Sequence, residues 1–255
     1  MSGFFSHTVG IGIYERYGWF HFLLLFITFF TCYLIYKNRV KIRNWKYYDK
    51  FMRILFSSLF IGNLLVNNLI QIITNTWSYK IHLPLHICYI ANLFLCYTLL
   101  TNNKKNSYKL TYFLSLVGPL TYLFFPDMAT ADGKSMLCGP DRSVFYLAFF
   151  SHNVLIIANF YCLFVYNWTI KKKNIFSTFV KINIIFGLVF IFNIIFKTNY
   201  IMTDGFPNFV YELIPILKHI NTILILEFVG ILVLTIAYLI TLVTIKNDKF
   251  IKNTN

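Results

Sequence analysis

The chain has 255 residues, of which 58% are hydrophobic and only 13% are charged, and its formal net charge is +14. A soluble domain carries about 25% charged residues, so too few charges remain here to cover a soluble core of this size. The Lys and Arg residues stand in short segments between apolar runs, which favours a topological role for the charge over nucleic-acid binding. We therefore expect an all-α, polytopic membrane helical bundle in which residues 1–255 form a single domain.

Seven apolar runs approach the length of about 20 residues that a membrane span needs. The first begins after about eighteen residues, has no basic segment before it and no small-residue cleavage site after it, so we expect a retained span and not a signal peptide. Four Asn and Gln side chains dilute the second run. In chain order, the runs cover residues 19–36, 51–74, 83–100, 108–125, 143–167, 175–196 and 220–245.

The basic residues predict the orientation. Most of the 23 Lys and Arg residues follow the first, third and fifth runs or stand in the tail after the seventh. Cytoplasmic segments carry the excess of Lys and Arg, so these segments are expected in the cytoplasm. The N-terminus then lies outside and the C-terminus lies in the cytoplasm, and we expect the protein at the cell (plasma) membrane.

With this orientation, the polar side chains of the spans gather in the outer leaflet. Such groups are costly in hydrocarbon and tend to face the bundle interior, so we expect one polar cavity open to the outer side. Hydrogen bonding between helices is a plainer explanation for the Asn residues of the second run. A carboxylate inside a span, in contrast, needs a partner or a proton. The expected lining consists of Asn67, Asn68, Gln71, Asn92, Asp127, Asn199 and Glu227.

The five cysteines do not suggest a disulfide framework or a zinc site, because no CxxC occurs and all except Cys138 lie in apolar runs. We expect no metal and no cofactor. Cys32, Cys96 and Cys162 are predicted to pack as small apolar side chains. Cys138, beside Gly139 and Pro140, has no role that its surroundings predict.

Short motifs resemble those of the YwaF-like family of integral membrane proteins. The segment Leu83-Pro84-Leu85-His86-Ile87-Cys88 resembles its LPLHxC signature, although Tyr89 follows where a small or acidic residue is expected. Further similar pieces are Gly118-Pro119, Phe125-Pro126-Asp127, Ser151-His152 and Asn199-Tyr200.

The resemblance implies a multi-pass membrane protein. A eukaryotic branch of these relatives resembles phospholipid acyltransferases that carry the acyl group on a membrane-embedded cysteine. The resemblance therefore implies Cys88 as nucleophile and His152 as base, with His86 as a second or supporting base.

The residues themselves are compatible with this chemistry, because a thiol needs a nearby base to become a thiolate. At 1.5 Å per residue, Cys88 is expected about 8 Å and His152 about 14 Å below the outer ends of their spans. His86 and Cys88 are about 200° apart on an ideal helix, so His152 is the better partner, whereas Asn92 shares a face with Cys88. A purely structural role, with Cys88 packed and His152 hydrogen-bonded, is the alternative.

Three functions are therefore compared. The first is an enzyme that acts on membrane lipids through Cys88 and His152. The second is a small-molecule or ion-coupled transporter that uses Glu227 or Asp127, although the internal repeats typical of transporters are not evident. The third is a receptor-like binding module. The expected partners are membrane lipids and not nucleic acids, and the sequence carries no signal for an oligomeric state.

Overall fold

The computed structural model describes residues 4–5, 17–45, 47–101, 104–124, 128–129, 135–136, 142–168, 171–206 and 208–254. The regular elements of the described residues are helices apart from one antiparallel pair of two-residue strands, β1 (Met128–Ala129) and β2 (Ser135–Met136). The α-helices are α1 (Trp19–Arg43), α2 (Tyr48–Ile73), α3 (Ile87–Leu100), α4 (Lys104–Phe124), α5 (Ser143–Phe164), α6 (Lys173–Phe196), α7 (Asn208–Leu213) and α8 (Thr222–Thr254). Two 3₁₀ turns, η1 (Tyr200–Met202) and η2 (Pro215–His219), flank α7. An all-α fold is thus confirmed.

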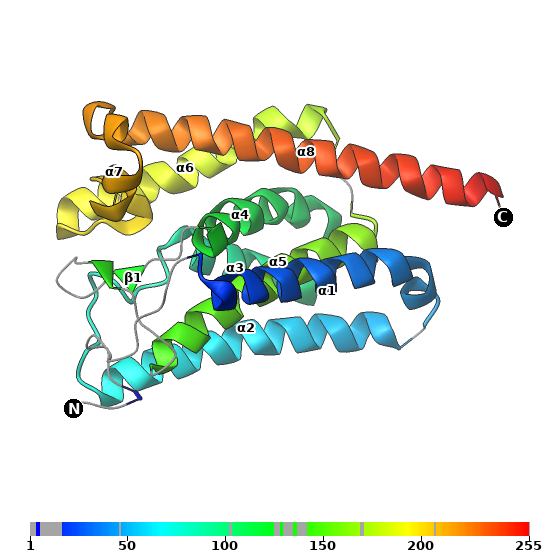
Figure 1. Ribbon diagram of the computed structural model, residues 1–255. Coiled ribbons are helices and arrows are strands. Elements are labelled where there is room, and N and C mark those ends of the chain that lie inside the picture. Colours follow the sequence, from blue (N-terminus) through cyan, green and yellow to red (C-terminus); the bar gives the residue numbers. More distant parts are fainter. Residues whose placement is uncertain are drawn as a thin grey trace.

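The central helix of the bundle is α4. It packs against α3 and α5 on one side and against α6 and α8 on the other. Figure 1 shows α6 and α8 along one side of α4, with α1, α2 and α5 along the opposite side. The large side chains of α4 are accordingly buried, among them Tyr108, Tyr112, Phe113, Leu114, Leu116 and Leu123.

The buried hydroxyls of α4 connect it to its neighbours. Tyr112 donates a hydrogen bond to the carbonyl of Ala237 on α8 over 2.8 Å, and Tyr108 donates one to the carbonyl of Asn159 on α5 over 2.8 Å. A buried hydroxyl without a partner would be costly, so these bonds fix how α4 is rotated between its neighbours.

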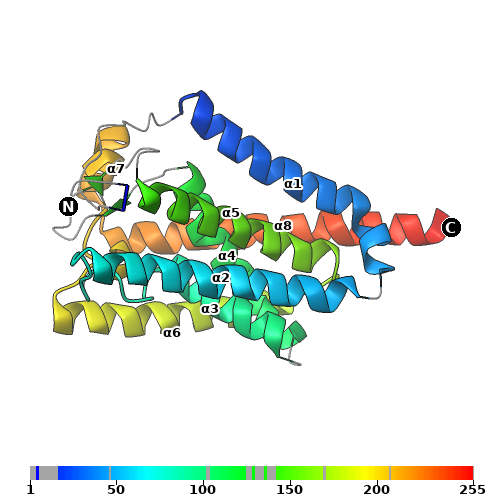
Figure 2. The same cartoon turned by 90° about the horizontal axis from the view of Figure 1, so that it is seen from below.

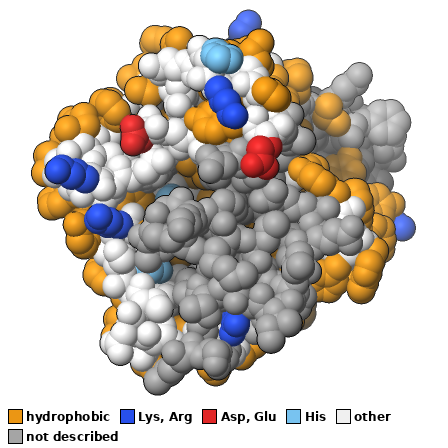
Figure 3. All heavy atoms as spheres, turned by 60° about the vertical axis from the view of Figure 1, so that its left-hand side comes forward, with side chains coloured by type: hydrophobic (Ala, Val, Ile, Leu, Met, Phe, Trp, Pro, Cys, Tyr) orange, Lys and Arg blue, Asp and Glu red, His pale blue; other side chains and the backbone are white. Residues whose placement is uncertain are grey.

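The peripheral helices expose their apolar side chains. Among the described helices, five are long and apolar enough to cross a membrane: α1, α2, α5, residues 174–196 of α6 and residues 222–244 of α8. Phe26 on α1 is 62% exposed and Phe228 on α8 is 69% exposed. Hydrophobic side chains also line the rim of the described surface in Figure 3. Exposed apolar surface of this extent suits hydrocarbon and not water, which identifies a multi-pass membrane protein.

The described helices differ from the predicted runs in two instructive places. The third run was predicted from residue 83, but α3 begins at Ile87 and has only 14 residues. Pro84 disfavours a helical conformation at the residue before it, and His86 is extended with ψ 146°. The fourth run became α4, which is not among the five apolar helices, because a helix enclosed by other helices needs no apolar surface toward lipid.

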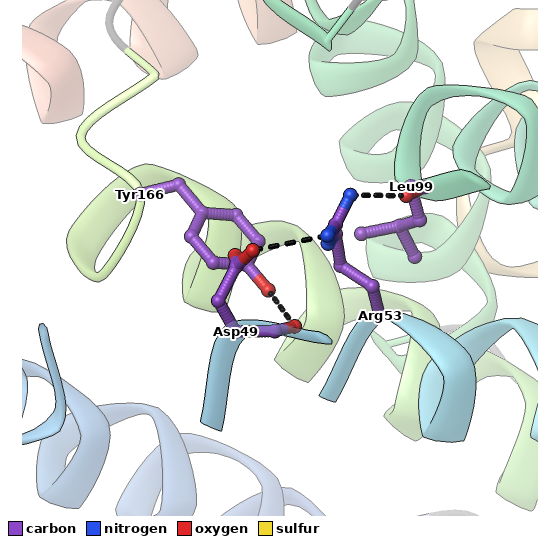
Figure 4. Close-up of polar contacts among 4 residues, drawn as sticks. All are labelled: Asp49, Arg53, Leu99 and Tyr166. Atoms are coloured by element: carbon purple, nitrogen blue, oxygen red, sulfur yellow. Dashed lines mark hydrogen bonds and ion pairs between the residues drawn. The ribbon is translucent and has the colours of Figure 1, made fainter. Parts of the chain in front are cut away.

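One end of the bundle is held by hydrogen bonds between helix termini. Arg43, the last residue of α1, donates to the carbonyls of Phe164 and Val165 at the end of α5, over 2.8 Å in the latter case. Close by, Tyr166 donates to the Asp49 carbonyl at the start of α2 over 3.1 Å. Figure 4 shows Asp49 also paired with Arg53, whose guanidinium reaches the carbonyl of Leu99 near the end of α3. These contacts hold together the ends of α1, α3 and α5 and the start of α2, from which the connections rich in basic residues extend.

The long helices run roughly along one direction, as Figure 2 shows. The end of α2 and the start of α3 therefore lie at the opposite end of the bundle, together with the end of α6 and the start of α8. The connection from α6 to α8 contains η1, α7 and η2, which the sequence did not predict.

Candidate functional site

The thiol of Cys88 lies against the imidazole of His152. Cys88 is the second residue of α3, and His152 lies near the middle of α5. The Cys88 Sγ atom is 3.1 Å from the His152 Nε2 atom, which is hydrogen-bonding distance for a thiol and a ring nitrogen. The structure thus brings together two side chains that are 64 residues apart in the sequence.

The other ring nitrogen of His152 fixes the tautomer. Its Nδ1 atom is 2.6 Å from the backbone carbonyl of Ala148, one turn earlier on α5. A carbonyl oxygen can only accept, so Nδ1 carries the proton in the neutral ring and donates it to Ala148. The Nε2 atom is then an acceptor that faces the thiol. The geometry is compatible with transfer of the thiol proton from Cys88 to His152 Nε2.

Two residues of α4 complete the surroundings of the pair. The ring of Tyr122 stacks on His152 with a centroid separation of 3.9 Å and an interplanar angle of 14°, which holds the imidazole plane. Gly118, one turn earlier, faces Cys88 directly. A Cβ atom at Gly118 would lie 2.7 Å from the Cys88 sulfur and 2.5 Å from Ile87 Cγ2, so only glycine permits this approach of α3 to α4.

The sequence did not single out Tyr122, and it drew attention to Gly118 only through the family resemblance. Their spacing of four residues was the available signal, because residues four apart share one face of a helix. A face formed by glycine and an aromatic residue can receive a small side chain together with a flat ring. Here these are the thiol of α3 and the imidazole of α5.

His86 has a different neighbour. Its ring meets the ring of Tyr200 edge to face, with centroids 4.8 Å apart. The Tyr200 hydroxyl accepts a hydrogen bond from the Leu83 amide over 3.1 Å and donates one to the Tyr79 carbonyl. His86 therefore packs on the residue that holds the segment before α3, whereas His152 contacts the sulfur.

Two polar residues of the expected cavity lie close to Cys88. One contacts the residue after it, and the other is one turn later on the same helix. Asn67 on α2 donates a hydrogen bond over 3.1 Å to the hydroxyl of Tyr89, the residue that directly follows Cys88. Tyr89, the residue that departs from the family pattern, is thus tied to α2. Asn92 follows Cys88 by one helical turn, and its buried Oδ1 has no hydrogen-bond partner among the described residues. An acceptor of this kind is available to a bound molecule or water.

Three further residues of the expected lining have local hydrogen-bond partners. Asn68 accepts from the Trp77 indole over 2.9 Å, and the buried Gln71 accepts from Thr76 over 2.5 Å, both near the end of α2. Asn199 is exposed and accepts from the Asp204 amide over 2.9 Å. Asp127 and Cys138 lie outside the described residues.

Glu227 belongs to the pair of helices α6 and α8. Its carboxylate accepts a hydrogen bond from Asn183 of α6 over 3.4 Å. Because α8 packs on α4 and α6, this carboxylate is associated with a different set of helices from the Cys88–His152 pair. In the part of the chain that the structure describes, no group of three or more His, Cys, Asp or Glu side chains is arranged to bind a metal.

The family model of the TMEM164 family matches residues 16–240. The chain belongs to the TMEM164 family. The matched range begins before α1 and ends inside α8, so it contains Cys88, Gly118, Tyr122 and His152 together. No curated protein and no solved structure matches the chain. Membership of the TMEM164 family, a family of transmembrane proteins, agrees with the apolar helices described above.

Proposed function

We propose that this TMEM164-family protein transfers acyl groups between membrane lipids, with the Cys88 thiol as the acyl carrier. The observation that carries the proposal is the 3.1 Å contact between the Cys88 sulfur and His152, whose Nδ1 proton is committed to the Ala148 carbonyl. A thiol with an oriented base is the minimal arrangement for nucleophilic catalysis. The resemblance to YwaF-like proteins and their acyltransferase-like relatives supports the same assignment.

The proposed first step forms a thioester. His152 Nε2 takes the proton of Cys88 while the sulfur attacks the carbonyl carbon of a lipid ester. The new C–S bond forms as the ester C–O bond breaks, and the imidazolium returns its proton to the leaving oxygen, which departs as a lysolipid alcohol. The acyl group then remains on Cys88.

The second step reverses the first with a different alcohol. The acceptor hydroxyl gives its proton to His152 Nε2 and attacks the thioester carbonyl, so that a C–O bond forms and the C–S bond breaks. The thiolate then takes the proton from the imidazolium. Tyr122 holds the ring plane through both steps, and no net oxidation or reduction occurs.

We propose further that the pair lies near the outer surface of a seven-span protein. The five apolar helices, the 14-residue helix α3 and the enclosed helix α4 are the seven proposed spans. The N-terminus is outside, the C-terminus is cytoplasmic, the host is the plasma membrane, and residues 1–255 act as one domain. An acyl chain can then remain in the bilayer while its ester reaches Cys88.

An ion-coupled transporter is the second candidate, and Glu227 is the observation that favours it. A carboxylate within a span is a functional-site candidate by default, and this one has an amide as its hydrogen-bond partner. If the protein is an ion-coupled transporter, Glu227 must bind and release a proton or cation in each transport cycle. Glu227→Gln should then abolish transport and leave thioester formation intact.

The test is acyl transfer by the purified protein in vesicles that contain a phospholipid with an isotopically labelled acyl chain. We expect a labelled, hydroxylamine-sensitive thioester on the Cys88 peptide, and its loss together with transfer in Cys88→Ala. The variant His152→Phe removes the proposed base, and we expect its rate of acyl transfer to be about 10²- to 10⁴-fold lower than that of the wild type.

The matched control for Cys88→Ala is Cys96→Ala. Cys96 lies on the same helix, is buried and has the Ser57 carbonyl as its partner 3.9 Å away. This variant should retain the thioester and the transfer. Unchanged transfer in Cys88→Ala, or the absence of any thioester on the wild-type chain, would remove the enzyme assignment.

A further inference from the structure

The connection after α6 has an unusual backbone. Lys197, Ile201 and Met202 have positive φ angles of 52°, 61° and 60°, which non-glycine residues rarely adopt. Such conformations persist only where the surroundings enforce them. Tyr200, directly before Ile201, is fully buried. The strained backbone therefore delivers one aromatic side chain into the protein.

A single amide group holds this conformation. Asn193 Oδ1 accepts hydrogen bonds from the Tyr200 amide (3.0 Å) and the Thr198 hydroxyl (2.6 Å). Its Nδ2 donates to the Tyr200 carbonyl (2.8 Å) and to Thr203 Oγ1 (2.8 Å). These four bonds use the full hydrogen-bonding capacity of an Asn side chain. Both backbone polar groups of Tyr200 are thus fixed to the last turn of α6.

The side chain of Tyr200 in turn holds the segment before α3 at three points. Its hydroxyl bonds to the Tyr79 carbonyl and to the Leu83 amide, and its ring meets the ring of His86. The His86 carbonyl accepts the first backbone hydrogen bond of α3, from Ile90 over 3.0 Å. Tyr200 therefore contacts the residues that determine where α3 begins.

The place where α3 begins sets the position of the sulfur. Cys88 follows His86 by two residues, and its Sγ lies close to both Gly118 and His152. The space is tight, since even a Cβ at Gly118 would lie 2.7 Å from the sulfur. A small displacement of the first turn of α3 would therefore change the distance from Sγ to Nε2.

We propose that Tyr200 is a positioning residue for the Cys88–His152 pair, through its contacts with Tyr79, Leu83 and His86. Asn193 acts one step further away, by fixing Tyr200. The consequence for catalysis rests on the proposed acyl transfer, whereas the consequence for the thiol does not. Tyr200 thus connects the end of α6 to a site formed by α3, α4 and α5.

The test compares Tyr200→Phe with Tyr211→Phe. Both variants remove one hydroxyl from the same connection, but the Tyr211 hydroxyl accepts from the Phe206 amide (3.0 Å) and stays within that connection. The readout is the rate at which N-ethylmaleimide alkylates Cys88 in vesicles, measured by mass spectrometry of the Cys88 peptide between pH 6 and pH 10.

We expect Tyr200→Phe to slow alkylation at neutral pH by about tenfold, since displacements of about 1 Å at a catalytic contact have large effects on rate. The pH at which alkylation is half-maximal should rise, because the thiol loses its base. Tyr211→Phe should leave both quantities at the wild-type values. Thr198→Val removes one hydrogen bond to Asn193 and keeps the side-chain shape, so it should change the alkylation rate and the half-maximal pH in the same direction by a smaller amount. This variant replaces Tyr200→Phe in the test if Tyr200→Phe does not fold.

Identical alkylation profiles for Tyr200→Phe, Thr198→Val and wild type would overturn the positioning role. Loss of acyl transfer with an unchanged profile would also overturn it, because Tyr200 would then act on the substrate and not through Cys88. A shifted profile in a protein whose wild type transfers no acyl group would support positioning and reject the proposed function.

Discussion

The sulfur of Cys88 is closely surrounded by residues of α4 and α5. Gly118 has no side chain at the point where α4 meets the first turn of α3, and His152 approaches the sulfur from α5. A Cβ atom at Gly118 would lie 2.7 Å from the sulfur, so there is no room for a side chain between the thiol and α4. The contact between thiol and base is thus maintained by packing as well as by hydrogen bonding.

Gly118→Ala should therefore harm both stability and the site. The new Cβ would overlap Ile87 and Cys88, and overpacking of this kind costs about 1–3 kcal/mol. We expect a lower melting temperature and slower alkylation of Cys88. The control is Gly62→Ala in α2, where a Cβ would meet nothing within 4 Å and the helix should gain roughly 0.5–1 kcal/mol. Equal melting temperatures for the two variants would show that Gly118 does not limit the approach of α3 to α4.

His82, in the connection between α2 and α3, should make stability depend on pH. Burial lowers the pKa of His82, and the Ser78 carbonyl 3.2 Å away opposes this in part. The neutral ring accepts a hydrogen bond from the Ser78 amide over 2.9 Å. Below about pH 6.5 the unfolded chain binds a proton that the folded chain excludes, so stability falls as the pH decreases from there toward the lowered pKa.

His82→Asn keeps an acceptor for the Ser78 amide and removes the titration. The melting temperature of this variant in detergent should decrease less between pH 7 and pH 5 than that of the wild type. The difference between the two curves isolates His82 from the other histidines. Parallel curves would mean that the pKa of His82 is the same in the folded and unfolded chains.

At this scale the sequence predicted a thiol and a base in one leaflet but not what surrounds them. The pairing of Cys88 with His152 was implied by the family resemblance, and the expected depths of the two residues were compatible with it. The stack of Tyr122 on His152 depends on the rotation of α4, which the hydroxyls of Tyr108 and Tyr112 help to set. A single sequence contains no local pattern for such a rotation.

At the scale of the elements, the ends of helices carry much of the tertiary hydrogen bonding. Arg43 donates to the last carbonyls of α5, which have no partner inside their own helix. A guanidinium suits this position because its charge also complements the negative end of the α5 dipole. At the end of the bundle opposite the Cys88–His152 pair, Arg43 thus adds hydrogen bonds to the packing of α1 on α5.

Arg43→Gln should lower the stability of the protein by about 1–3 kcal/mol, since buried carbonyls would lose charged donors. The control is Lys41→Gln, which removes the same charge from the last turn of α1 at an exposed position. Thermal unfolding of both variants in detergent measures the difference. If Lys41→Gln were as destabilised as Arg43→Gln, the effect would come from the charge of α1 and not from the contact with α5.

The elements themselves were predictable to different degrees. Each of the seven apolar runs coincides over most of its length with one described helix, because hydrophobicity and length together identify such helices. The start of α3 was placed too early, since the run continues through Pro84 while the helix does not. The helix α7 and the turn η2 were missed because they are shorter than any span and have no periodic pattern long enough to detect.

At the scale of the whole molecule, enclosure explains which helices can be polar. The helices α1, α2, α6 and α8 expose apolar side chains, whereas α3, α4 and α5 carry Cys88, Gly118, Tyr122 and His152. An imidazole that would be costly next to lipid is tolerated between helices that provide it with hydrogen-bond partners. Composition predicted the membrane, but only the packing shows that α4 is the enclosed helix.

The proposed orientation makes a prediction that involves two exposed lysines at opposite ends of the bundle. Lys80 lies in the connection between α2 and α3, and Lys171 lies between α5 and α6. The excess of basic residues at the end that contains Lys171 should keep that end in the cytoplasm. In a chain whose own cysteines are replaced by serine, Lys80→Cys should react with a membrane-impermeant maleimide added to intact cells. Lys171→Cys should react only after the membrane is permeabilised. Labelling of both positions in intact cells would contradict an odd number of spans between them, and the reverse pattern would place the Cys88–His152 pair near the cytoplasmic surface.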